Sequence, residues 1–410
     1  RGIPIPDSAQ PSGVAPLSKI PVFDPNKLVE VLIWKKPPSR MGDGSYSDDG
    51  RMEPNSLHNI RVFMRHHPKY SGIFRYDRFS HKIYVNIEPF WNKLLGRGTF
   101  EPREIEDIDT YYMTAAMEQE GVASNGGKVR EAIEVSAQEN WMNPPVEYFD
   151  SLIWDGLDRN RTFMQKYVGA QGHPDYLLSA TNAMLIGAVA RVYQPGCQAD
   201  TMVVFEGEQG IRKSSMLALL ANFIPGRSYF CDTLTFKDIG GISAKDATLK
   251  LCGKIFCEFA EMASLYAREV EDVKQWLSIR DDEMRKPYGR ETTRFKRQFI
   301  PVGTTNKSHW LKDPTGNRRF EPIKCEYVDI ESLAADRDQI WAQAVHDYKN
   351  GVQWWIEKTS SVWAYAESEQ SMRVMEDIWF EPVERFVEHL NFVTVPDILL
   401  SFDIKIKEQT

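Results

Sequence analysis

Residues 203–215 read Val-Val-Phe-Glu-Gly-Glu-Gln-Gly-Ile-Arg-Lys-Ser-Ser, and this stretch determines the fold class that we expect. The apolar residues 203–205 are typical of a buried parallel strand. Residues 216–220, which follow the Lys-Ser pair, are good helix formers. A strand, a glycine-containing loop and a helix in this order can bind phosphate, because loop N–H groups surround it and the helix N-terminus adds the positive end of its dipole.

The residue types of this loop predict individual roles in binding a nucleotide. Lys213 can reach the β- and γ-phosphates, and the Ser214 hydroxyl can hold Mg²⁺. One position departs from the usual pattern, because Arg212 stands where glycine normally precedes the lysine. Glycine is favoured there since the turn uses backbone angles that strain other residues. A strand–turn–helix with a chance Lys-Ser pair is the alternative interpretation. The other predicted nucleotide-binding residues are Gly207, Gln209, Gly210, Ile211 and Ser215.

Three segments further along the chain favour nucleotide hydrolysis. Glu258 and Glu261 end a second apolar run, where strand-end carboxylates can bind Mg²⁺ and activate water. An acidic helix start would explain the same glutamates. A third apolar run leads to Thr304, Thr305 and Asn306, and an Asn or Thr at that point can orient the attacking water, with Asn306 the residue that we assign to this role. Arg318 and Arg319 follow a turn, and an arginine can neutralise charge on the γ-phosphate in cis or from a neighbouring subunit.

Together, the loop and these segments predict an ATPase site that uses ATP and Mg²⁺. Ser214 and Glu258 are the expected metal ligands. Which glutamate acts as the base, and which arginine meets the γ-phosphate, is left open. The predicted catalytic residues are Lys213, Glu258, Glu261, Asn306, Arg318 and Arg319.

With these motifs, the chain resembles the virulence-associated E family of phage- and island-encoded P-loop ATPases, which are related to superfamily 3 helicases of the AAA+ class. The resemblance implies an α/β fold with a parallel sheet flanked by helices and a homo-oligomeric, hexameric ring. It also implies an ATP-driven helicase or translocase of mobile-element replication that acts on single-stranded or forked DNA, with a primase or primase-polymerase domain upstream. The matching segments are Tyr148–Gly156, Gly187–Arg191, Pro195–Cys197, the 203–215 stretch, Glu258–Glu261, Arg285–Arg290, Gly303–Asn306 and Gly316–Phe320.

A rival function stays open from the sequence alone. Arg212 and the net charge of −8 are compatible with a nucleotide-gated DNA-binding or regulatory module that does not unwind DNA. The net acidity also argues against a generally basic nucleic-acid coat, so we expect any DNA contact to be local and to lie inside a channel.

Bulk properties indicate a cytoplasmic protein without a membrane partner. No stretch approaches the roughly 18 uncharged apolar residues of a membrane span. The five cysteines are odd in number and lack Cys-x-x-Cys spacing, which favours reduced thiols. The chain starts at Arg1 without an initiator methionine, so we expect a fragment or a processed form.

A basic stretch is the predicted DNA contact. Residues 285–297 contain six basic side chains and one acidic side chain. We expect a pore-facing loop or hairpin that follows a phosphate backbone. The alternative is a solvated basic edge, or arginines that pair with the acids of residues 281–283. The predicted DNA-binding residues are Lys286, Arg290, Arg294 and Lys296.

Composition and periodicity divide the chain into five predicted segments. The N-terminal region is expected to be mostly helical with one small β-hairpin within residues 72–88, and to serve oligomerisation or DNA binding. A helix is predicted over 128–141, with one face formed by Val129, Ile133, Ala137 and Trp141. The segments are a proline-rich linker (1–25), the N-terminal region (26–195), the P-loop ATPase core (196–330), its helical C-terminal part (331–375) and the start of a truncated winged-helix-like tail (376–410).

Overall fold

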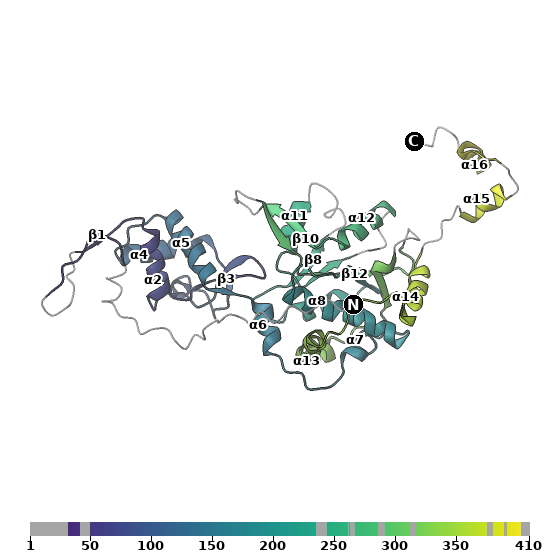
Figure 1. Cartoon of the computed structure of the whole chain (residues 1–410), viewed down its shortest axis with the longest axis horizontal. Helices are drawn as coiled ribbons and strands as arrows, with labels where there is room; N and C mark the ends of the chain where they lie inside the picture. Colours follow the sequence, from purple (N-terminus) through teal and green to yellow (C-terminus); the bar gives the residue numbers. More distant parts are fainter. Residues whose placement is uncertain are drawn as a thin grey trace. The chain divides into compact units, whose positions relative to one another are not determined.

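The computed structural model contains two compact units (Figure 1). One unit takes in the chain up to Pro144 together with Ile224–Arg227, and the other takes in Pro145–Phe223 and the chain from Ser228 onward. The sequence placed a boundary near residue 195, but residues 145–195 belong to the second unit because their longest helix packs on its sheet. The described residues are 32–41, 50–234, 244–260, 262, 267–285, 292–311, 317–374, 380–388 and 392–402.

The first unit contains a four-stranded sheet of order β5-β4-β3-β6. The predicted hairpin is confirmed as β3 and β4, with Phe74 opposite Val85. The sequence missed β5 and β6, because strands of two residues are too short to show an alternating pattern. The elements are β1 (Trp34–Lys36), β2 (Arg51–Met52), α2 (Leu57–His66), β3 (Phe74–Asp77), β4 (Lys82–Val85), α3 (Phe90–Leu94), β5 (Arg103–Glu104), α4 (Asp107–Gln119), α5 (Gly126–Glu139) and β6 (Trp141–Met142).

The predicted helix over 128–141 is confirmed in most of its length as α5. Val129, Ile133 and Ala137 are fully buried in the core of the first unit. Trp141 was wrongly assigned to the same helix face. The helix ends at Glu139, and Trp141 instead begins β6, where it pairs with Tyr76 of β3.

The second unit contains a five-stranded parallel sheet of order β13-β7-β12-β9-β8. The predicted α/β fold with a parallel sheet and flanking helices is therefore confirmed. The elements are α6 (Pro144–Ser151), η2 (Asn160–Thr162), α7 (Phe163–Val168), α8 (Pro174–Tyr193), β7 (Met202–Glu206), α9 (Lys213–Ala221), β8 (Phe230–Leu234), α11 (Ala244–Leu251), β9 (Phe256–Phe259), α12 (Ala267–Leu277), β10 (Asp281–Arg285), β11 (Thr292–Lys296), β12 (Ile300–Thr305), η4 (Asn317–Arg319), β13 (Phe320–Lys324), α13 (Ile330–Lys349), α14 (Ser361–Ser371), α15 (Phe380–Val387) and α16 (Val395–Ser401).

Helices cover both faces of this sheet. Residues of α12, such as Trp276, join Met202 and Val204 of β7 in one core cluster. On the other face, Trp341 of α13 packs against Phe256 of β9, and α8 contacts β7, β12 and β13. In Figure 1, α8 and α13 accordingly lie on one side of the strands, with α12 on the other. Every residue of β7, β9 and β12 is buried, as expected for parallel strands that are covered on both faces.

The register of the strands brings the predicted site segments together. β12 lies between β7 and β9, with Thr305 paired with Glu206 and Gly303 paired with Phe259. The carboxyl ends of these three strands therefore lie side by side. Loops at the carboxyl edge of a parallel sheet usually form its ligand-binding crevice, so we expect the functional site at this edge.

The C-terminal part of the described chain is helical. α13 and α14 make up most of the helical C-terminal part that was predicted over 331–375, and Ile340, Trp341 and Ala344 are buried. Residues 380–388 and 392–402 contain α15 and α16, within the segment where a winged-helix-like tail is predicted. Among the helices that the structure describes, none has both the length and the apolar character needed to cross a membrane.

Candidate functional site

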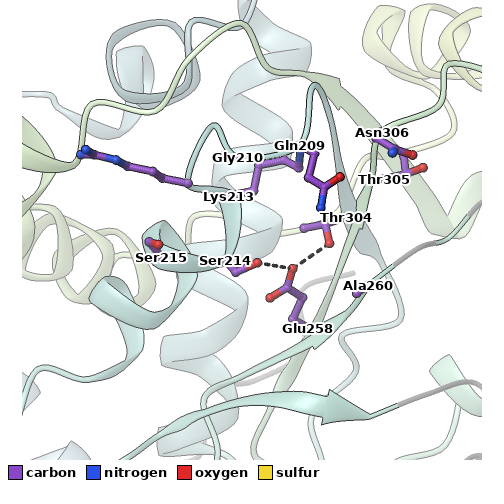
Figure 2. A pocket seen from close by; sticks show the side chains of 11 residues that line it. Gln209, Gly210, Lys213, Ser214, Ser215, Glu258, Ala260, Thr304, Thr305 and Asn306 are labelled. Carbon is purple, nitrogen blue, oxygen red and sulfur yellow. Dashed lines mark hydrogen bonds between the residues drawn. The ribbon is translucent and has the colours of Figure 1, made fainter.

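A cavity of about 450 Å³ opens at the carboxyl ends of β7, β9 and β12 (Figure 2). Segments that are far apart in the sequence meet there: the loop after β7, the first turn of α9, and the ends of β9 and β12. The lining residues are Gln209, Gly210, Arg212, Lys213, Ser214, Ser215, Glu258, Ala260, Thr304, Thr305 and Asn306.

Two glycines shape the loop that follows β7. A Cβ atom at Gly207 would lie 2.6 Å from the carbonyl oxygen of Cys325, so no side chain fits there. The Gly207 N–H donates to the Thr305 carbonyl at 3.1 Å and fixes the start of the loop against β12. Gly210 has a φ of +89°, which favours glycine. Gly207 and Ile211 do not line the cavity, so their contribution is to the shape of the loop.

Lys213 is the first residue of α9 and its ammonium group folds back over the loop. Nζ donates to the carbonyl oxygens of Gly207 at 2.7 Å and Glu208 at 2.8 Å. Partial burial lowers the pKa of Lys213 from its ordinary value. The ammonium therefore lies within a glycine-containing loop at a helix N-terminus, which is an arrangement that can accept the phosphates of a nucleotide.

Glu258 is the polar centre of the cavity. Its side chain comes from β9 and only 2% of the residue is exposed. Oε1 accepts hydrogen bonds from Ser214 Oγ at 2.8 Å and from Thr304 Oγ1 at 2.7 Å, as Figure 2 shows. A carboxylate and hydroxyl oxygens are hard oxygen donors, which is the ligand type that Mg²⁺ uses in proteins. The Ser214 and Glu258 side chains therefore fit the predicted metal ligation.

Thr304 was considered only as a residue that could orient the attacking water, and its contact with Glu258 was not predicted. The sequence offered a weak signal, since two threonines and an asparagine follow a buried apolar run at the end of a strand. Asn306, which was predicted, follows β12 and lines the same cavity. The carboxyl end of β12 thus contributes one side chain that orients Glu258 and a second, exposed side chain at the mouth of the cavity.

Arg212 adopts the left-handed backbone conformation at a position where the sequence pattern normally has glycine. Its φ and ψ are 71° and 27°, and it precedes the first residue of α9. Its guanidinium pairs with Glu331 at 3.1 Å, and both side chains are mostly exposed. The position therefore keeps the backbone geometry of the glycine motif at the cost of local strain.

Replacing Arg212 by glycine should stabilise the second unit by about 0.5–1 kcal/mol, because the strain of a left-handed non-glycine residue exceeds the added freedom of the unfolded chain. Loss of the exposed ion pair with Glu331 should change the free energy of unfolding only slightly. The measurement is chemical denaturation of Arg212→Gly beside Arg212→Ala, which loses the same pair but keeps the strain. Equal stabilities of the two variants would contradict this reading of the loop.

The remaining predicted catalytic residues do not line the cavity or are not described. Arg318 is exposed on η4, and Arg319 donates to Ser278 Oγ at 3.0 Å. Neither arginine belongs to the cavity lining. Glu261 lies outside the described residues, so the choice between the two glutamates as base stays a prediction.

The basic stretch includes β11, which pairs antiparallel with β10, and it shares only Arg285 with β10. Arg294 and Lys296 are exposed on β11, whereas Lys286 and Arg290 lie outside the described residues. Arg294 pairs with Glu283 at 3.0 Å in an exposed position, as the alternative interpretation expected. Surface pairs of this kind are weak, so Arg294 could exchange its partner for a phosphate.

Comparison with known proteins identifies the family of the domain that contains this cavity. The profile of the virulence-associated protein E-like domain matches residues 149–374, more than half of the chain. No curated protein sequence matches. Among solved structures, the chain is similar to the apo structure of the NrS-1 C-terminal region (305–718), with a TM-score of 0.44 and 12% identity over 79% of this chain and 80% of that one. It is also similar to an A-form apo structure of the same region, with a TM-score of 0.40 and 12% identity over 78% and 80% of the two chains. Since the profile match includes the whole five-stranded sheet and its cavity, the chain belongs to the virulence-associated protein E-like family.

Proposed function

We propose that the chain is a P-loop ATPase of the AAA+, superfamily 3 helicase-like type, and that the cavity at the carboxyl ends of β7, β9 and β12 hydrolyses ATP. The observation that carries the proposal is the pair of hydrogen bonds from Ser214 and Thr304 to Glu258 Oε1, beside an ammonium group held in a glycine loop. Three different elements contribute side chains to this arrangement, which supports a nucleotide site over a chance Lys-Ser pair after a strand.

Each side chain in or near the cavity has a separate proposed role in phosphoryl transfer. Lys213 would leave its two loop carbonyls and bind the β- and γ-phosphate oxygens. Ser214 and Glu258 would hold Mg²⁺, which neutralises charge on the same oxygens when bound. Asn306 would orient the attacking water at the mouth of the cavity. Glu258 or Glu261 would accept its proton, and the two hydrogen bonds to Glu258 favour Glu261 as the base.

Arg318 or Arg319 would complete the site of a neighbouring subunit. Both lie on η4, outside the lining of the cavity in their own chain. Arg318 is exposed, as an arginine that reaches another subunit must be. An arginine supplied in this way stabilises the charge of the transition state. The expected assembly is a homo-oligomeric ring, a hexamer by family resemblance.

We further propose that ATP hydrolysis drives movement on single-stranded or forked DNA during replication of a phage or another mobile element. Membership of the virulence-associated protein E-like family supports this role. The exposed Arg294 and Lys296 on the β10–β11 hairpin could follow a phosphate backbone, together with Lys286 and Arg290. A primase or primase-polymerase domain upstream remains part of the proposal.

The direct test of this role is unwinding of a forked DNA duplex with a labelled strand, in the presence of Mg²⁺ and ATP. The chain should release the labelled strand only when ATP is hydrolysed, so the Lys213→Ala variant and a non-hydrolysable ATP analogue should both abolish release. Assembly that depends on nucleotide, without strand release or ATP turnover, would instead support a nucleotide-gated DNA-binding or regulatory module.

A further inference from the structure

A buried ion pair lies directly before the phosphate-binding loop and outside the cavity. Glu206 is the last residue of β7 and immediately precedes Gly207. Arg373, two residues beyond the end of α14, holds its carboxylate with two N–H groups: Nε lies 3.0 Å from Oε1 and Nη2 lies 3.0 Å from Oε2. The two side chains are only 7% and 12% exposed. Neither residue lines the cavity, and the two are 167 positions apart in the sequence.

The same arginine also holds the chain that follows Asn306. Its backbone carbonyl accepts hydrogen bonds from the N–H groups of Trp310 at 3.1 Å and Leu311 at 3.0 Å. The Trp310 indole N–H donates to Glu206 Oε1 at 2.6 Å. Arg373 therefore connects the end of β7, where the loop starts, with the segment that continues from the end of β12.

The helix that precedes Arg373, α14, is itself anchored to the sheet. Arg373 Nη1 donates to the Glu369 carbonyl at 3.0 Å and pairs with the Glu369 carboxylate. Gln370 Nε2 donates to the carbonyl of Phe320 in β13 at 3.0 Å. Because β13 pairs with β7, these contacts hold the guanidinium at a fixed place beside Glu206.

The charge of Glu206 makes this contact relevant to nucleotide binding. Without the guanidinium, the Glu206 carboxylate loses the partner that fixes its position, and any negative charge that it retains one residue before the loop would repel the phosphates of ATP. A planar guanidinium neutralises it and also fixes its direction through two parallel hydrogen bonds, which an ammonium group cannot do. Glu206 directly precedes Gly207 in the chain, and the Gly207 carbonyl oxygen accepts a hydrogen bond from the Lys213 ammonium.

We propose that Arg373 is a positioning residue for the phosphate-binding loop: it neutralises Glu206 and holds the start of the loop against the segment that follows Asn306. The inference rests on the proposed ATPase function and deepens it, because it adds to the ATP site a residue from beyond α14 that touches neither nucleotide nor metal.

The test compares steady-state ATP hydrolysis by variants of the whole chain, at a temperature where each is folded by circular dichroism. Arg373→Gln should raise KM for MgATP about tenfold or more and lower kcat by a smaller factor, because a displaced loop and an uncompensated charge first affect phosphate binding. Arg373→Lys, which keeps the charge but not the parallel hydrogen bonds, should lie between Arg373→Gln and wild type.

Two further variants separate a positioning role from a loss of stability. The double variant Glu206→Gln, Arg373→Gln should return KM to within about threefold of wild type, because no unpaired carboxylate is left directly before the loop. Arg159 provides the matched control: its guanidinium pairs with Asp155 through two 2.8 Å hydrogen bonds and with Asp336, its side chain is 16% exposed, and it does not line the cavity. Arg159→Gln should lower stability and leave KM unchanged.

Several results would overturn the inference. An unchanged KM in Arg373→Gln, a double variant as impaired as Arg373→Gln, or an equal rise of KM in Arg159→Gln would each show that Arg373 acts only on general stability. These outcomes leave ATP hydrolysis by the wild-type chain intact, so they are distinct from failure of the proposed function. A wild-type chain that neither binds nor hydrolyses ATP would overturn both.

Discussion

Replacing Lys213 by alanine should lower ATP turnover by at least about 10²-fold while the chain stays folded. The ammonium of Lys213 donates hydrogen bonds to the loop carbonyls of Gly207 and Glu208. A loop lysine contributes little to a core, so the variant should keep its circular dichroism spectrum. In the proposed reaction, the same ammonium would neutralise charge that develops on the β- and γ-phosphates, and no other lysine lines the cavity among the residues that the structure describes.

The measurement is steady-state release of inorganic phosphate from MgATP by the variant and by the wild-type chain. Lys307→Ala is a useful control, because Lys307 follows Asn306 directly, is exposed, and is not among the residues that line the cavity. It should hydrolyse ATP at close to the wild-type rate. Full activity in Lys213→Ala would show that the loop after β7 is not the phosphate site.

Replacing Glu258 by glutamine should also lower ATP turnover by about 10²-fold or more, because it weakens the binding of Mg²⁺ rather than the binding of the phosphates. Glutamine keeps an oxygen that can accept from Ser214 Oγ and Thr304 Oγ1, so the contacts that link β9 to α9 and β12 should survive. The negative charge that attracts Mg²⁺ is lost. We therefore expect a higher Mg²⁺ concentration for half-maximal activity in addition to the lower rate.

Glu321 provides a matched control for this variant. It is a buried glutamate in the same sheet, on β13, and it does not line the cavity. Burial raises the pKa of Glu321 to about 8, so the side chain is mostly protonated at pH 7 and glutamine is a close substitute. Glu321→Gln should keep wild-type turnover and Mg²⁺ dependence. A Glu258→Gln variant that behaves like Glu321→Gln would rule out Glu258 as a metal ligand.

The pH dependence of stability provides a separate check on Glu321. Its folded-state pKa is raised, so the carboxyl stays protonated above its unfolded pKa of about 4.3. The stability contributed by this protonation is therefore fully present below that unfolded value and is lost as the pH rises through about 8. Glu321→Gln should remove this part of the decline in stability toward high pH.

The sequence was sufficient to predict the site segments that follow directly on a strand. Residues 203–215 combine a buried run, two required glycines and a helix start, and each of these is a local signal. Glu258 and Asn306 likewise follow apolar runs, and the parallel strands bring both to one cavity with Lys213 and Ser214. Their assigned roles in hydrolysis remain predictions.

Features that depend on distant contacts could not be predicted in the same way. The position of β12 between β7 and β9 decides that Thr304 reaches Glu258, and no local pattern encodes that order. The pair of Glu206 and Arg373 joins residues 167 positions apart. Arg212 is an intermediate case: the motif indicated which backbone angles the position needs, and the structure has arginine adopting them.

The most direct test of the central claim is ATP turnover by the unaltered chain with Mg²⁺, measured with and without single-stranded DNA. We predict hydrolysis that requires Mg²⁺ and rises when DNA is added, because the proposed site would bind phosphate and metal and the proposed DNA contact lies on the β10–β11 hairpin. A chain that shows no ATP turnover under either condition, although it is folded and binds single-stranded DNA, would contradict it.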